Sequence, residues 1–168
     1  MSKKPMWGAA LAGALIAGGV YTAPSASAVS GPEHCAVVIK KVEPGQAESK
    51  VVSKQCAGSA EALNVKGSGT ALAPAALFTL YDDSDFRGSS YTIYGNEGDC
   101  DGSGYRYPTL GWSYNDFARS IRLHGACDTA NLHEHANWGG LVTRVDGYRS
   151  DLGDLNDRVS SIAVWNTY

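Results

Sequence analysis

The stretch Leu80-Tyr-Asp-Asp-Ser-Asp-Phe-Arg-Gly88 returns 52 positions later as Leu132-His-Glu-His-Ala-Asn-Trp-Gly-Gly140, and this repeat decides the fold. The leucines, the aromatic residues before the glycines and the glycines themselves coincide. A glycine in a hairpin suits a backbone position with positive φ, and the preceding aromatic ring can cover such a turn. An internal repeat of this kind indicates two copies of one structural unit.

A second pair of stretches keeps the same register. Leu110-Gly-Trp-Ser-Tyr-Asn-Asp-Phe-Ala-Arg-Ser-Ile121 matches Leu152-Gly-Asp-Leu-Asn-Asp-Arg-Val-Ser-Ser-Ile162 with one residue deleted, and each copy then ends in a short alternating strand, 120–124 or 161–165. The first copy carries about eleven extra residues around 97–107. Alternation at 77–81, 90–94 and 141–145 also predicts antiparallel strands. Four short strands per copy predict a two-sheet β sandwich.

Together these stretches resemble the double signature of the βγ-crystallin Greek key. The first signature stands at Tyr81–Gly88 and, less perfectly, at His133–Gly140; the second is complete at Asn156–Ser161 and damaged at Asn115–Ser120. The resemblance implies an all-β, βγ-crystallin-like two-sheet sandwich over residues 77–168. Its Greek key motifs would span about 77–124 and 128–168.

The resemblance also implies calcium, which takes six to eight oxygen ligands. In the family, one motif supplies a backbone carbonyl and the hydroxyl at the fifth position of the second signature. The partner motif supplies a carboxylate and an oxygen from its first hairpin. The first expected site therefore comprises the Arg158 carbonyl, the Ser160 hydroxyl, the Asp116 side chain and an oxygen of Asp82.

The second expected site is weak. It would use the Phe117 carbonyl, the Asp157 side chain and Glu134, but Arg119 stands where a hydroxyl is needed. A guanidinium has five donors and no acceptor, and its charge opposes a dication. We expect Arg119 to pair with Asp157 and Glu134 and to hold the loops without metal. A simpler reading of both loops is that their Asp and Ser side chains only stabilise turns.

Residues 1–28 are predicted to be a secretory signal peptide, with Lys3 and Lys4 before an apolar stretch and Ala26-Ser-Ala28 at the cleavage point. The apolar stretch is too short to span a bilayer. We therefore expect a secreted chain without a membrane anchor after cleavage. In an exported chain, Cys35, Cys56, Cys100 and Cys127 predict two disulfides, for which three connectivities are possible. We favour Cys35 with Cys56 and Cys100 with Cys127, because each pair then lies within one compositional unit.

Composition changes near Leu77. Residues 29–76 contain no aromatic residue and no arginine and carry a net charge of +1, whereas residues 77–168 contain no lysine and carry −6. This predicts a small disulfide-stapled N-terminal module or linker segment, with a strand at Cys35–Val42 and a second element around 49–56, before the β domain. The 168-residue chain has a net charge of −3 and no long basic run, which argues against binding of nucleic acid.

The function that these features favour is that of a secreted, non-enzymatic calcium-binding protein with one good and one degenerate ion site. No nucleophile setting is present, so we expect no enzyme activity. The alternative is a secreted binding effector, such as the metalloproteinase inhibitor or the antifungal killer-toxin-like proteins among exported bacterial βγ-crystallin-like proteins. Its partner would be a secreted protease or a cell-envelope component, and the insertion that contains Cys100 is the candidate loop. For Trp112, Tyr114, Trp138 and Trp165 we favour core or hairpin-cover roles over a sugar-binding face.

Overall fold

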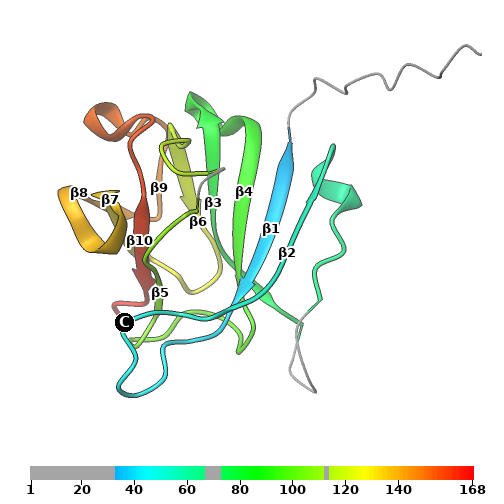
Figure 1. The fold of residues 1–168 in the computed structure, drawn as a ribbon, viewed down its shortest axis with the longest axis vertical. Helices are drawn as coiled ribbons and strands as arrows, with labels where there is room; N and C mark the ends of the chain where they lie inside the picture. The colour runs from blue at the N-terminus through cyan, green and yellow to red at the C-terminus, as the bar shows by residue number, and fades with distance from the viewer. Residues whose placement is uncertain (1–32, 67–72, 112–113) are drawn as a thin grey trace, which may run out of the picture.

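Two β-sheets make up the part of the chain that the computed structural model describes, residues 33–66, 73–111 and 114–168 (Figure 1). The predicted signal peptide, residues 1–28, and Trp112 lie outside these residues. The strands are β1 (His34–Ile39), β2 (Val51–Ala57), β3 (Ala75–Asp83), β4 (Arg87–Gly95), β5 (Tyr105–Tyr107), β6 (Ser120–Leu123), β7 (Thr129–His135), β8 (Gly139–Asp146), β9 (Tyr148–Arg149) and β10 (Ser161–Trp165). Four short 3-10 turns lie between them, η1 (Ala60–Ala62), η2 (Ser84–Phe86), η3 (Ala136–Trp138) and η4 (Gly153–Leu155).

The strand order is that of two Greek key motifs that exchange one strand. One sheet has the order β2-β1-β4-β3-β6-β9 and the other β5-β10-β7-β8. The first motif places β3, β4 and β6 in one sheet and sends β5 to the other; the second motif keeps β7, β8 and β10 and sends β9 across. The predicted all-β, βγ-crystallin-like sandwich is confirmed.

The core lies between the sheets and is built from equivalent residues of the two motifs. Leu80 and Leu132, which coincide in the sequence repeat, are both fully buried. Ile121 and Ile162 at the start of the two closing strands are also fully buried. Strand alternation explains this, because every second side chain of β6 and β10 points into the sandwich.

The N-terminal segment contributes two strands to the larger sheet. β1 pairs in parallel with β4 and antiparallel with β2 (Figure 1). Residues Cys35–Ile39 are at most 2% exposed. A segment without aromatic residues therefore becomes buried by sharing the core of the following β domain. The strand predicted at Cys35–Val42 corresponds to β1, and the second element predicted around 49–56 corresponds to β2.

Both favoured disulfides are present. Cys35 bonds to Cys56, its registered partner across β1 and β2, and Cys100 bonds to Cys127. The second bond fastens the insertion of the first motif to the start of the second motif. No helix among the described residues is long and apolar enough to cross a membrane.

Candidate metal centre between the two motifs

The first hairpin of each motif is closed by a pair of rings. Tyr81 and Phe86 meet edge to face at 5.9 Å between ring centroids, and His133 and Trp138 meet in the same way at 5.7 Å. His133 therefore occupies the aromatic position of the second motif. Burial lowers its pKa, which favours the neutral imidazole for this packing role.

The loops before the two closing strands hold each other by equivalent backbone hydrogen bonds. The amide of Asp116 donates to the Val159 carbonyl at 3.1 Å, and the amide of Asp157 donates to the Ala118 carbonyl at 2.9 Å. Asp116 and Asp157 both have positive φ, 57° and 55°. Asp tolerates this left-handed conformation better than most residues. As a result, each Asp side chain is placed beside the signature loop of the other motif.

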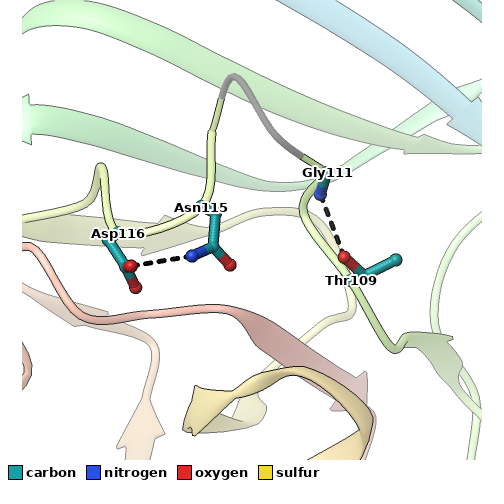
Figure 2. Close-up of a pocket in the computed structure, with 4 residues that line it drawn as sticks. All are labelled: Thr109, Gly111, Asn115 and Asp116. Atoms are coloured by element: carbon teal, nitrogen blue, oxygen red, sulfur yellow. Dashed lines mark hydrogen bonds between the residues drawn. The ribbon is translucent and has the colours of Figure 1, made fainter.

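Ser160 and its neighbours bring three oxygen groups together. The Ser160 hydroxyl, in a residue only 3% exposed, donates its hydrogen to the Glu134 carbonyl at 2.7 Å, and its oxygen lies 3.3 Å from Asp116 Oδ1. The other Asp116 oxygen accepts a hydrogen bond of 2.7 Å from the Asn115 amide, and Figure 2 shows these two side chains directed at one another. We refer to this region as the Ser160 pocket. Its lining consists of Asn115, Asp116, Glu134, His135, Ala136, Asp157, Arg158 and Ser160.

The hairpin residues of the two expected sites are exchanged relative to our prediction. We expected Asp82 beside Ser160 and Glu134 beside Arg119. In the structure the Glu134 carbonyl accepts a hydrogen bond from the Ser160 hydroxyl. Asp82 instead lies near Arg119, and the charge of Asp82 helps to raise the pKa of Arg119. The reason is strand pairing: each closing strand lies beside the first strand of its own motif, with Ser161 opposite His133 and Ser120 opposite Tyr81.

Arg119 stands at the position of the first motif that is equivalent to Ser160, and its guanidinium supplies a positive charge there. Its Nε donates to both Asp157 oxygens at 3.0 and 2.9 Å, and its Nη2 donates to Oδ2 at 2.7 Å. These hydrogen bonds, followed by the charge of Asp157, raise the pKa of Arg119. The expected pairing with Asp157 is present. The expected pairing with Glu134 is replaced by an ion pair between Glu134 and Arg158.

The Glu134 carboxylate is held on two sides. Its Oε2 accepts a hydrogen bond of 2.9 Å from the Leu141 amide, and its Oε1 accepts one from Arg158 Nη2. The backbone hydrogen bond from Leu141 and then the Arg158 hydrogen bond lower the pKa of Glu134. Glu134 therefore presents its backbone carbonyl to Ser160, while its side chain is occupied elsewhere. The pairing of β10 with β7, which sets Ser161 opposite His133, is the signal that could have assigned the Glu134 carbonyl to Ser160.

Two other groups of possible ligands do not form metal sites. Among the described residues, Glu33 approaches Cys35 and Cys56, and Asp99 approaches Cys100 and Cys127. Both cysteine pairs are disulfides, so their sulfurs are not available as thiolate ligands.

No protein-family model matches this chain, and no curated protein matches it. Solved βγ-crystallin structures are similar in fold. The N-terminal domain of protein S is 22% identical over 54% of this chain and 97% of its own, with a TM-score of 0.43. A βγ-crystallin domain from Flavobacterium johnsoniae is 26% identical over 54% and 96%, with a TM-score of 0.42. A βγ-crystallin from an archaeon is 22% identical over 53% and 96%, with a TM-score of 0.39. The details of the site rest on this chain's own residues.

Proposed function

We propose that this protein is a secreted, non-enzymatic calcium-binding protein that takes one ion in the Ser160 pocket and is stabilised by it. The observation that carries the proposal is the convergence of the Ser160 hydroxyl, the Asp116 carboxylate and the Glu134 carbonyl on one pocket. These are oxygen groups of the kinds that calcium prefers.

The spacing of these oxygens suits neighbouring ligands of one ion. Two oxygens at about 2.4 Å from calcium and about 70–90° apart stand roughly 2.8–3.4 Å from each other. The Ser160 oxygen lies 2.7 Å from the Glu134 carbonyl and 3.3 Å from Asp116 Oδ1. An ion would replace the hydrogen bond from the hydroxyl to the Glu134 carbonyl and its contact with Asp116, and the hydroxyl would then turn a lone pair toward the metal.

The pocket can also supply the remaining ligands. Its volume is about 360 Å³, against roughly 30 Å³ for a water molecule in the liquid. The Arg158 carbonyl is the fourth protein ligand that we propose, and water would complete the shell. The Arg158 side chain remains on Glu134 and need not move for this.

The charge around the pocket favours weak binding. Arg119 neutralises Asp157, and Arg158 neutralises Glu134, so Asp116 is the main uncompensated carboxylate at the ion position. Calcium affinity depends on the number of charged ligands, and extracellular modules bind with dissociation constants of about 10⁻⁴–10⁻³ M. We expect an affinity in this range. At the equivalent place in the first motif, Arg119 supplies the positive charge and we expect no ion.

The proposal of secretion rests on the predicted signal peptide and on two disulfides, which are typical of exported proteins. In that setting a weak site would be filled by extracellular calcium and would add to the stability that the disulfides provide.

Thermal unfolding of the mature protein with increasing calcium tests the proposal, with magnesium as the control. Calcium should raise the melting temperature in a saturable way, and equal magnesium should raise it less, since magnesium demands a tighter octahedral shell. No calcium-dependent rise at millimolar concentrations would leave Asp116 and Ser160 with turn stabilisation alone and would refute the proposal.

A further inference from the structure

We propose that the outer face of the β5-β10-β7-β8 sheet is a binding groove for a short oligosaccharide that carries a carboxylate group. Two adjoining hollows of about 320 and 220 Å³ share Arg106 and Ala163 as lining residues. Trp165 and Asn131 belong to the first hollow and Trp138 to the second. We call the two hollows together the Trp groove.

The floor of the groove follows from strand register. Ala163 is paired with Arg106 on one side and with Asn131 on the other, so the three residues form a row across β5, β10 and β7. Their chain neighbours, such as Ile162 and Val164, are buried in the core, so this row points outward. A single methyl group in the middle of the row leaves the sheet surface hollow at that place.

The first motif has a hollow of its own, lined by Phe86, Thr79 and His124 among others, but a guanidinium stands where the second motif has Ala163. Ala163 corresponds to Arg122 in the repeat, and the Arg122 guanidinium lies 4.3 Å from the centroid of the Phe86 ring. Trp165 corresponds to His124, whose ring makes a 2.8 Å hydrogen bond with Thr79. The second motif therefore has a small residue where the first has a covering guanidinium.

Trp165 and Trp138, for which we expected core or hairpin-cover roles rather than a sugar-binding face, line the groove at its two ends. Trp165 is opposite Thr129 in the register, Ser161 is opposite His133, and the Trp138 ring packs against His133. The four-residue step along β10 corresponds to about 13 Å at roughly 3.3 Å per residue. Indole rings present flat apolar faces with one polar atom, which suits the mixed apolar and hydroxyl surface of a sugar ring. Two such rings at this spacing suit a short oligosaccharide.

The charge of the groove selects an acidic ligand. Among the described residues, the exposed Arg106 side chain makes no hydrogen bond or ion pair. Two carboxylates on neighbouring segments are paired with other cations, because Lys41 binds Asp101 at 2.7 Å and Arg144 binds Asp146 at 2.9 Å. A guanidinium binds a planar carboxylate through two parallel hydrogen bonds. Arg106 would therefore hold a uronate or another sugar carboxylate between the indole rings.

The insertion of the first motif forms one wall of the groove. Gly102 and Ser103 line it, and Gly104 packs so closely on β10 that a Cβ would lie 2.3 Å from the Val164 carbonyl oxygen. The adjacent loop is tied by the Cys100–Cys127 disulfide. This wall is held in place before any ligand arrives, which reduces the ordering cost of binding.

Tryptophan fluorescence titration in the presence of a chelator tests the proposal without calcium. The probes are trigalacturonic acid, a hyaluronan tetrasaccharide and sialyllactose, with maltotriose as the neutral control. At least one acidic probe should change the fluorescence in a saturable way and bind more tightly than maltotriose. No saturable change with any acidic probe up to about 10 mM, or equal binding of maltotriose, would overturn the proposal.

Three variants test where the probe binds. Arg106→Gln should weaken binding of the acidic probe about tenfold or more, whereas Arg149→Gln, on β9 of the other sheet, should not change it. Ala163→Arg adds positive charge but puts a long side chain on the floor of the groove, at the position that Arg122 holds in the first motif, so it should abolish binding. Tighter binding by Ala163→Arg would show that charge alone attracts the probe and would refute the groove. Near-ultraviolet circular dichroism checks that each variant is folded.

Discussion

Replacing Ser160 by alanine removes the hydroxyl that links Asp116 to Glu134. The variant distinguishes a calcium site from a loop whose side chains only stabilise a turn. In the absence of calcium the variant loses a 2.7 Å hydrogen bond to the Glu134 carbonyl and a 3.3 Å contact with Asp116. The first is worth about 1 kcal/mol. Water in the open pocket can replace part of it, so the calcium-free variant should be destabilised by about 1 kcal/mol or less.

The loss should be larger with calcium. Free calcium at about one hundred times the dissociation constant stabilises a one-site protein by ~2.7 kcal/mol. If removal of one oxygen ligand raises the dissociation constant about tenfold, the same calcium concentration stabilises the variant by only ~1.4 kcal/mol. The calcium-induced rise in melting temperature should therefore fall to about half. For a chain of this size, 1 kcal/mol corresponds to roughly 2–4 °C.

Ser161→Ala is the matched control. The Ser161 hydroxyl is fully buried, donates to the His135 carbonyl at 2.7 Å and accepts from the Trp138 amide at 3.2 Å, but it does not line the Ser160 pocket. This variant should lose at least as much stability without calcium, yet keep the full calcium-induced rise. Differential scanning calorimetry at several calcium concentrations measures both effects. Equal calcium-induced rises in the two variants would refute the assignment of Ser160 as a ligand.

Three further predictions concern the surrounding structure. Arg119→Ser removes the internal cation and supplies the missing hydroxyl, so calorimetric titration should detect a second calcium ion; an unchanged stoichiometry would contradict the role given to this arginine. Gly104→Ala should destabilise more than Gly147→Ala in urea unfolding: both glycines have positive φ, but a Cβ at Gly104 would lie 2.3 Å from the Val164 carbonyl oxygen, whereas that at Gly147 meets nothing within 4 Å. Equal losses would show that the packing of the insertion on β10 is not limiting. The pKa of Glu134 lies below its ordinary value of 4.5 in the folded chain, so its contribution to stability is present above pH 4.5 and disappears as the pH falls through the lowered pKa. Glu134→Gln should flatten this acid limb of the stability curve, and an identical limb in the variant would argue against the Leu141 and Arg158 contacts as its cause.

The sequence repeat predicted the β domain well because it records local structure. Leucine and isoleucine positions that coincide in the repeat are core positions, and glycine at 88 and 140 marks the two hairpins. The sequence also placed Asp116 near Ser160, since the paired signatures interlock. It did not predict which hairpin lies beside which loop, because that depends on pairing of β10 with β7 and of β6 with β3.

Two features depend on contacts between segments that are distant in the sequence. The parallel pairing of β1 with β4 joins segments that are 56 positions apart in register, such as His34 with Ser90, and arises only when the core is shared. The difference between Ala163 and Arg122 is visible in the printed sequence. Its consequence for the sheet surface depends on which residues lie beside them on neighbouring strands.

Isothermal titration of the mature wild-type protein with calcium tests the central claim most directly, because it counts the ions. One ion per chain, with a dissociation constant of about 10⁻⁴–10⁻³ M, is the predicted result. Two equivalent ions would contradict the role of Arg119 as the cation of the first motif. No binding heat at millimolar calcium, together with an unchanged melting temperature, would contradict calcium binding in the Ser160 pocket.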